Sequence, residues 1–354
     1  MSVFEMMEKY GHEQVVFNYD PVSGLRAIIA IHDTTLGPAL GGTRMWPYKT
    51  EEEALFDVLR LSRGMTYKNA AMGLNLGGGK AVIIGDPRKD KSEELFRAFG
   101  KFVETLNGRY ITAEDVGTTT EDMDIIRTQT KWVVGLRETS GNPSPATAYG
   151  VFRAMHAAVK YLWNLDSLKG LRVAVQGTGS VGLDLIRRLL EAGATVVATD
   201  IYPDKLEKAV ELGATACAPE AIYSQDCDIF APCALGGIIN DETIPRLKAK
   251  IVCGCANNQL LEPHHGKALS ARGILYCPDF IVNGGGVTNV ADEIRPGGYN
   301  RERAMASVAR IYDILLRVFQ TAKEKGMETY EAADYMAEER INKALRQKKM
   351  YMRE

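Results

Sequence analysis

The sequence lacks the features that would place it in several specialised classes of protein. Lys and Arg number 43 against 45 Asp and Glu, a net charge of -2, so no basic excess attracts nucleic acid or an anionic membrane. No apolar run approaches the roughly 20 residues of a membrane span. The amino terminus has neither the basic nor the apolar segment of a secretory signal. We therefore predict a cytoplasmic protein that binds neither nucleic acid nor membrane.

Cysteine and histidine are also scarce, with six and five residues among 354. All the cysteines lie in the second half, and four of them stand in or beside apolar runs, where small core residues are a better interpretation than disulfides. The histidines show no metal-ligand spacing, and His264-His265 looks like part of a polar loop. The sequence therefore predicts no metal site.

What the sequence does contain is a regular alternation of strands and helices. Residues 137–145 are polar and rich in turn formers, and they divide the chain into two halves. Apolar, unpatterned strands alternating with helices after Leu171 indicate a parallel sheet covered on both faces, an α/β fold. The predicted strands of this half are 172–176, 195–199, 228–231, 250–254 and 275–282.

A glycine-rich turn follows the first of these strands. Gly177-Thr178-Gly179-Ser180-Val181-Gly182 opens a helix, and Asp200 ends the next strand, 18 residues after Gly182. Here Gly177 permits a tight turn, Gly179 lets backbone amides approach a pyrophosphate, and Gly182 lets helix and strand pack closely. A carboxylate at Asp200 can accept from both ribose hydroxyls of NAD and would repel the extra phosphate of NADP. The motif predicts an NAD site, and a glycine-rich turn with a capping aspartate is the alternative.

Two lysines in the first half stand among small and apolar residues. Gly77-Gly78-Gly79 precede Lys80 at the start of an apolar strand, and Lys68 lies twelve residues upstream. Two amines close together in a desolvated cleft lower each other's pKa, so one can bind a carboxylate while the other acts as a general base. Asp115, after the predicted strand 110–113, is the third candidate, able to hold an amino group or relay a proton. Solvated lysines and a turn aspartate are the structural alternatives.

These motifs are where the chain resembles a known family. It is similar, nearly from end to end, to the leucine dehydrogenases within the glutamate/leucine/phenylalanine/valine dehydrogenase family. The resemblance is carried by the glycine and lysine motifs above and by the further segments 37–45, 112–118, 140–145, 231–234, 256–259 and 289–293.

The resemblance implies two α/β domains with a cleft between them. Residues 1–138, joined by a C-terminal helix of about 330–354, would form the substrate-binding, catalytic and oligomerisation domain, and residues 139–329 a Rossmann-like NAD domain. The implied reaction is the reversible oxidative deamination of an L-amino acid to a 2-oxo acid, ammonia and NADH, carried out by a homo-oligomer.

The resemblance also implies roles for single residues. Lys68 would bind the substrate carboxylate, Lys80 would be the general base, and Asp115 would shuttle protons. The substrate would also contact Gly41, Gly42, Met65 and a side-chain pocket of Leu40, Ala113, Val134, Val287 and Val290. Beyond the glycine-rich turn and Asp200, the cofactor would contact Cys233, Ala234, Asn257, Asn258 and Asn283.

The pocket positions are aliphatic or small and offer no cation to a side-chain carboxylate, which favours leucine, isoleucine or valine over glutamate. Aromatic substrates, phenylalanine or tryptophan, are the alternative. Residues 4–7 and Leu162-Trp163 resemble phenylalanine dehydrogenases, and the short segment 134–141 resembles tryptophan-using relatives. A second alternative is an NAD-binding protein without turnover, which the presence of Lys68, Lys80 and Asp115 together disfavours.

Overall fold

The computed structural model describes residues 2–351, which divide into two compact units. Within this range, unit 1 comprises residues 2–142, 290–301 and 337–351, and unit 2 comprises residues 143–289 and 302–336. The predicted C-terminal helix is α13 (Thr329–Tyr351), and its predicted positions 352–354 lie outside the described residues. Among the helices of the described range, none combines the length and the apolar character needed to cross a membrane.

Unit 1 is built on a mixed sheet with the strand order β1-β2-β5-β3-β6, and β4 also pairs with β5. β2 runs antiparallel to β1 and β5, whereas β3 and β4 run parallel to β5. The three glycines before Lys80 belong to β5 itself, which places this lysine in the middle of the sheet. The strands are β1 (Gln14–Asp20), β2 (Leu25–Asp33), β3 (Ala39–Leu40), β4 (Thr43–Trp46), β5 (Gly77–Ile84) and β6 (Tyr110–Ile111).

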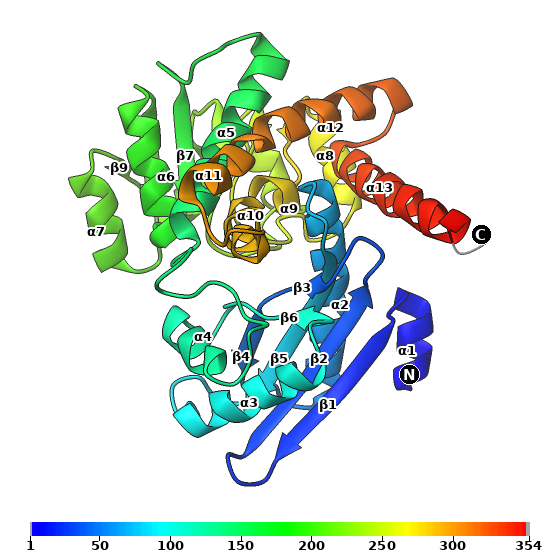
Figure 1. Cartoon of the computed structure of the whole chain (residues 1–354). Helices are drawn as coiled ribbons and strands as arrows, with labels where there is room; N and C mark the ends of the chain where they lie inside the picture. The colour runs from blue at the N-terminus through cyan, green and yellow to red at the C-terminus, as the bar shows by residue number, and fades with distance from the viewer. Residues whose placement is uncertain (1, 352–354) are drawn as a thin grey trace. The chain divides into compact units, whose positions relative to one another are not determined.

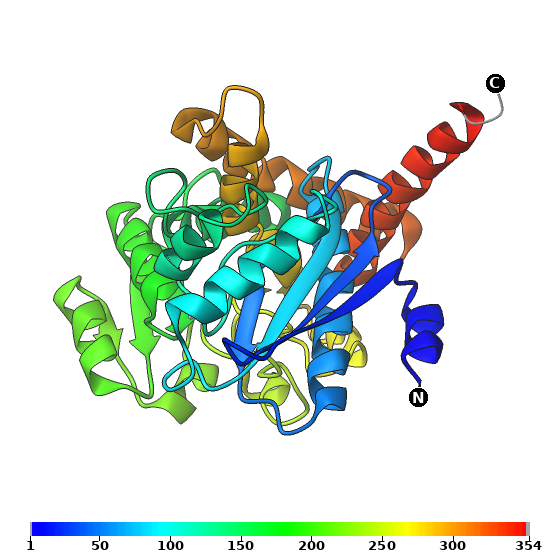
Figure 2. The same cartoon turned by 60° about the horizontal axis from the view of Figure 1, so that its bottom comes forward.

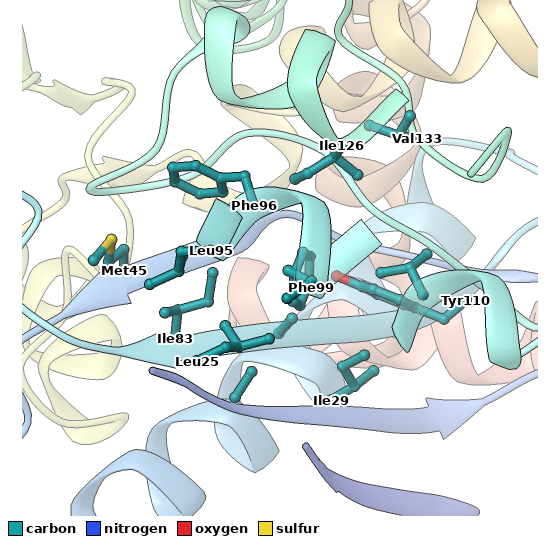
Figure 3. Packing of buried hydrophobic residues seen from close by; sticks show 14 of the residues in the cluster. Leu25, Ile29, Met45, Ile83, Leu95, Phe96, Phe99, Tyr110, Ile126 and Val133 are labelled. Atoms are coloured by element: carbon teal, nitrogen blue, oxygen red, sulfur yellow. The ribbon is translucent and has the colours of Figure 1, made fainter. Parts of the chain in front are cut away.

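Helices cover both faces of this sheet because β2 alternates apolar side chains between them. Leu25 and Ile29 pack with Phe99 in a core under α3 and α4 (Figure 3). Ile28 points to the opposite face, where it packs with Leu59 of α2. Figures 1 and 2 show α3 crossing one face and α2 the other. The helices are α1 (Val3–Tyr10), α2 (Glu51–Ala71), α3 (Glu93–Thr105) and α4 (Thr120–Arg127).

Unit 2 has a parallel sheet in the order β12-β11-β10-β7-β8-β9, which confirms the predicted α/β fold. Its strands are β7 (Arg172–Gln176), β8 (Thr195–Thr199), β9 (Thr215–Ala216), β10 (Ile229–Pro232), β11 (Ile251–Val252) and β12 (Leu275–Tyr276). The helices are α5 (Ser144–Trp163), α6 (Ser180–Glu191), α7 (Pro203–Glu211), α8 (His264–Ala271), α9 (Asp279–Val282), α10 (Gly285–Ala291), α11 (Arg301–Ala309) and α12 (Ile311–Lys325), with short 3-10 turns between them.

The prediction of one strand over 275–282 is wrong. β12 ends at Tyr276, and Pro278 caps the short helix α9. Proline has no N–H to continue a strand ladder, and the buried run Ile281-Val282 has no periodicity that separates a strand from a short buried helix. Asn283 therefore follows a helix rather than ending a strand.

Two buried histidines join α2 to the first strands of unit 1. The rings of His12 and His32 meet edge to face with centroids 4.8 Å apart. Nε2 of His12 lies 2.9 Å from Ser62 Oγ, and Nδ1 of His32 lies 2.8 Å from Thr66 Oγ1. Burial lowers the pKa of each from 6.5 to about 4, assisted by repulsion between the rings at His12 and by Arg63 at both.

This pair predicts acid sensitivity of unit 1. Between pH 6.5 and 4 the unfolded chain binds more protons at His12 and His32 than the folded chain, so their contribution to stability is complete above pH 6.5 and is lost as pH falls toward 4. The loss is on the order of 3 kcal/mol for each histidine. Urea unfolding across this range should show a steeper pH dependence for the wild type than for the double variant His12→Gln, His32→Gln. Equal slopes would contradict the assignment.

Candidate active site

Lys80 is a buried lysine on β5 with an acidic partner. Its side chain is 6% exposed, and its Nζ lies 3.0 Å from Oδ1 of Asp115. A buried ammonium needs such a partner, because an unpaired charge in the protein interior is strongly destabilised. The structure thus brings two of the three predicted chemical groups into one ion pair.

Asp115 is held through both carboxylate oxygens. Its Oδ2 accepts a hydrogen bond from Nε of Arg44 at 3.0 Å, and Arg44 also donates to Asp57 of α2 at 2.9 Å. Burial by itself raises the pKa of Asp115, but the charges of Lys80 and Arg44 and the hydrogen bonds from both lower it to about 2. Asp115 is therefore a carboxylate at ordinary pH, suited to accept a proton and pass it on rather than to store it.

Gly41 and Gly42 fill the narrow space between β5 and the Asp115 segment. A methyl group on Gly41 would lie 1.8 Å from the carbonyl oxygen of Gly79 and 3.1 Å from Cγ of Met65. A methyl group on Gly42 would lie 3.0 Å from Cβ of Asp115. Only glycine fits both positions, so these two predicted substrate contacts and Met65 gather around the same part of the sheet.

Lys68 stands in the last turn of α2 with a half-buried side chain. Two residues before it, Thr66 lies so close to β5 that a methyl group on Gly78 would be 2.1 Å from the Thr66 nitrogen. One residue after it, the buried Asn69 amide donates to the carbonyl oxygens of Leu40 at 3.3 Å and Gly77 at 2.6 Å. α2 is thus fixed against the start of β5 on both sides of Lys68. The mutual pKa lowering of the two amines stays a prediction.

The end of α2 is held by α13, which sequence reasoning missed. Arg340 donates to the carbonyl oxygens of Ala70 at 3.0 Å and Leu74 at 2.6 Å, and to Oδ1 of Asn75 at 2.8 Å. The last carbonyl groups of a helix have no partner within the helix, and Arg340 supplies one. Since Arg340 is about 270 residues away along the chain, no local pattern could have indicated this contact.

Four of the five predicted pocket positions lie in unit 1, and all four are buried. The Val134 nitrogen donates to the Thr112 carbonyl oxygen at 2.9 Å, which places Val134 beside the strand end that leads to Ala113. A methyl group on Gly135 would lie 3.8 Å from Cγ1 of Val290. The four positions are Leu40, Ala113, Val134 and Val290; Val287, the fifth, is half-buried on α10 in unit 2.

Glu293 organises the loop that carries Val134. Its Oε1 accepts from the backbone nitrogens of Gly135 at 3.0 Å and Ser140 at 3.1 Å, and also from the Ser140 hydroxyl. One carboxylate oxygen therefore gathers residues 135–140 against the segment 290–301 of the same unit. Glu293 lies in the segment 289–293, which carries part of the family resemblance, but its contacts with Gly135 and Ser140 could not be predicted from that segment alone.

The glycine-rich turn of unit 2 joins β7 to α6. Gly177 has a φ of 100°, and a methyl group on Gly182 would lie 2.1 Å from the Gly177 carbonyl oxygen. Gly179 is the N-cap residue of α6, and no side chain caps the helix there. A methyl group on Gly179 would meet nothing within 4 Å. A helix start that is uncapped by side chains and open to approach is suited to a pyrophosphate.

Asp200 follows β8, the neighbour of β7. Its carboxylate stabilises the glycine-rich turn through hydrogen bonds. Its Oδ2 accepts from the Thr178 nitrogen at 2.7 Å, and its Oδ1 accepts from the Tyr202 nitrogen at 3.0 Å. Burial raises the pKa of Asp200, but these hydrogen bonds and the charge of Lys205 outweigh it and lower the pKa. The residue predicted to accept from ribose is thus an ionised carboxylate that also shapes the turn.

The other predicted cofactor contacts gather at the same edge of the sheet. Cys233 and Ala234 follow β10, which also neighbours β7, and a methyl group on Gly177 would lie 2.8 Å from the Ala234 nitrogen. Nδ2 of Asn283 donates to Oδ1 of Asn257 at 2.8 Å, while Oδ1 of Asn283 is buried without a hydrogen bond. A buried acceptor in need of a donor, in the same unit as an open glycine turn, fits a dinucleotide with an amide-bearing base.

Comparison with known proteins gives consistent matches to both units. The family profile "Glu/Leu/Phe/Val dehydrogenase, dimerisation domain" matches residues 12–132, and "Glutamate/Leucine/Phenylalanine/Valine dehydrogenase" matches residues 140–200 and 204–348. The chain is 63% identical over 345 residues to a leucine dehydrogenase of Geobacillus stearothermophilus, covering 96% of this chain and 94% of that one. It is 53% identical to a phenylalanine dehydrogenase of Caldalkalibacillus thermarum, covering 95% and 92%.

A solved structure is similar along almost its whole length. The crystal structure of L-tryptophan dehydrogenase from Nostoc punctiforme matches with a TM-score of 0.84 and 48% identity, covering 97% of this chain and 99% of that one. The likeness therefore extends over both units and includes relatives named for aliphatic and for aromatic amino acids.

Proposed function

The chain belongs to the glutamate/leucine/phenylalanine/valine dehydrogenase family, and from this premise we propose how its residues divide the work of NAD-dependent deamination of a branched-chain L-amino acid. It is an amino-acid dehydrogenase, an oxidoreductase that converts the amino acid to a 2-oxo acid and ammonia. The observation that carries the proposed division is the buried Lys80–Asp115 ion pair beside the Gly41-Gly42 backbone.

The residues of unit 1 bind the amino acid and move protons. Lys68 pairs with the substrate carboxylate, and the bare backbone of Gly41 and Gly42 admits the substrate close to β5. Bound NAD would supply the acceptor for the hydride that leaves the substrate Cα. Asp115, ionised by its two cationic neighbours, would take a proton from the substrate ammonium before the hydride leaves. Lys80, after releasing its own proton to solvent, would take a proton from the water that attacks the substrate imine, and Asp115 would return a proton to the nitrogen that leaves as ammonia. Hydrolysis of the imine releases the 2-oxo acid and ammonia.

The residues of unit 2 hold the cofactor. The open start of α6 at Gly179 receives the pyrophosphate, and Asp200 accepts from the adenosine ribose and disfavours NADP. Asn283 offers its unsatisfied Oδ1 to the nicotinamide amide, with Asn257 and Asn258 beside it. By the same family relation we propose that the enzyme works as a homo-oligomer through its dimerisation domain.

Removing the charge of Asp200 should relax the choice of cofactor. Asp200→Ala should reduce the preference for NAD over NADP by about tenfold or more, because a like-charge contact with the extra phosphate is lost. Asp200→Asn keeps an acceptor for the Thr178 nitrogen, so it separates loss of charge from loosening of the turn. kcat/KM with each cofactor measures the effect, and unchanged selectivity in both variants would count against Asp200 as the ribose acceptor.

The side-chain pocket favours an aliphatic substrate. Leu40, Ala113, Val134 and Val290 are buried and apolar, so a branched side chain gains burial that a carboxylate side chain cannot. Aromatic amino acids are the second candidate because relatives named for phenylalanine and tryptophan are 53% and 51% identical to this chain over 344 and 350 residues.

A substrate panel tests the proposal. NADH formation should be measured with leucine, isoleucine, valine, phenylalanine and tryptophan, each with NAD and with NADP. We expect the highest kcat/KM with a branched-chain amino acid and NAD. A higher value with phenylalanine or tryptophan would transfer the assignment to the aromatic class, and no turnover with any L-amino acid would overturn it.

A further inference from the structure

Unit 2 contains a cluster of possible metal ligands that the proposed reaction does not use. Asp241 lies in the turn after Ile239, and His264 and His265 are the first two residues of α8 (Figure 1). One ligand atom from each of these three side chains lies within 4.8 Å of the others. The prediction that His264-His265 lies in a polar loop is wrong, because the two residues begin α8 and His265 is buried.

His265 has the features of a metal ligand. Its side chain is 2% exposed, and its Nε2 makes no hydrogen bond although it is buried. Its Nδ1 accepts a hydrogen bond from the Glu262 nitrogen at 2.9 Å and also lies 3.1 Å from the Glu262 carbonyl oxygen. Metal binding at Nε2 would move the ring proton to Nδ1, where this carbonyl oxygen can accept it. Histidines that bind metals commonly donate the other ring N–H to such a carbonyl group. An unpartnered nitrogen in the interior is otherwise unfavourable.

The spacing suits a small divalent ion. Nε2 of His265 lies 3.4 Å from Oδ1 of Asp241. With metal–ligand bonds of about 2.0–2.1 Å, two donors of a tetrahedral site are separated by about 3.3–3.4 Å. The His264 ring lies 4.0 Å from the His265 ring, centroid to centroid, and its ligand atom lies within 4.8 Å of the other two.

We propose that Asp241, His264 and His265 form a binding site for a divalent transition-metal ion such as Zn²⁺, with water completing the coordination. Two imidazoles and one carboxylate suit zinc, nickel or cobalt better than magnesium or calcium, which prefer all-oxygen sites. The site is structural and takes no part in the deamination.

The site would clamp two segments of unit 2 that already lie side by side. Ile239 and Leu260 form a parallel bridge, and the Gly237 nitrogen donates to the Asn258 carbonyl oxygen at 2.7 Å. Asp241 lies just beyond one side of this bridge and His264 just beyond the other. An ion bound only by the folded chain stabilises it by mass action, so the expected sign is an increase in Tm.

The test uses full-length enzyme freed of metals by chelation. Zinc should raise Tm by about 2–5 °C and bind with a Kd measurable by calorimetry, whereas magnesium should do neither. His264→Gln changes an exposed residue and should weaken zinc binding at least tenfold. Asp241→Asn should weaken it as well, and Glu242→Gln, which removes a neighbouring exposed charge, should leave it unchanged.

Two outcomes would overturn the proposal. Zinc binding of equal strength in the wild type, His264→Gln and Asp241→Asn would place the ion elsewhere, for example on thiols. Absence of any zinc effect on Tm or heat would mean that Asp241 and His265 form only a side-chain pair at 3.4 Å and hold no ion. Because these readouts need no substrate, they are independent of the deamination assay.

Discussion

Lys80→Ala is expected to lower kcat for oxidative deamination by about 10²- to 10⁴-fold, the range over which a positioned general base contributes. The ion pair with Asp115 is lost, but Arg44 still binds that carboxylate, so Asp115 keeps a charged neighbour and the local structure is retained. NADH affinity, measured by fluorescence titration, should be unchanged because the proposed cofactor groups all belong to unit 2.

Lys80→Arg is the matched control for this variant. Arginine keeps the positive charge beside Asp115 but does not give up its proton at ordinary pH, so it cannot act as a base. We expect Lys80→Arg to be nearly as inactive as Lys80→Ala. Full activity with arginine would make Lys80 an electrostatic residue, and loss of NADH affinity in either variant would contradict the division of roles between the two units.

Gly78→Ala is expected to destabilise unit 1 strongly. The added carbon would lie 2.1 Å from both the backbone nitrogen and Oγ1 of Thr66, so α2 could not keep its position on β5. Backbone atoms cannot rotate away as a flexible side chain can, and overpacking of a core typically destabilises by about 1–3 kcal/mol or more. We expect a lower urea midpoint and, in any folded fraction, an increased KM as Lys68 moves with its helix.

Gly64→Ala supplies the comparison, because it adds a methyl group to α2 itself, at a position where nothing lies within 4 Å. Alanine favours a helix over glycine by about 0.5–1 kcal/mol, so this variant should be slightly stabilised and fully active. A stable, active Gly78→Ala enzyme would show that the close approach of α2 to β5 is not required.

The parts of the site that could be predicted are those formed by residues that are contiguous in the sequence. The glycine turn at 177–182, the strand around Lys80 and the parallel sheet of unit 2 each have a local pattern with a physical cause. The strand predicted over 275–282 failed because a short buried helix after Pro278 has the same apolar character. In that case the burial was predictable and the backbone conformation was not.

The supporting contacts were not predictable because they join distant segments. Asn69, Arg340 and Glu293 each satisfy backbone groups near the proposed substrate residues, and the local sequence around each of them gives no sign of these contacts. Arg44 is similar, since its pairing with both Asp57 and Asp115 depends on how β4 lies beside α2. Chemistry-bearing residues can be recognised by type and spacing, whereas the residues that orient them are identified only by the fold.

Unit 1 is assembled from the beginning, the middle and the end of the chain, and this has a consequence for biosynthesis. The ribosome produces residues 2–142 first, yet the Arg340 contacts that terminate α2 exist only after almost the whole polypeptide has been translated. Unit 2 is nearly complete before then. Synthesis of unit 1 therefore begins first and ends last. A nascent chain that stalls late in translation would lack the Arg340 contacts at the end of α2, the helix that carries Lys68.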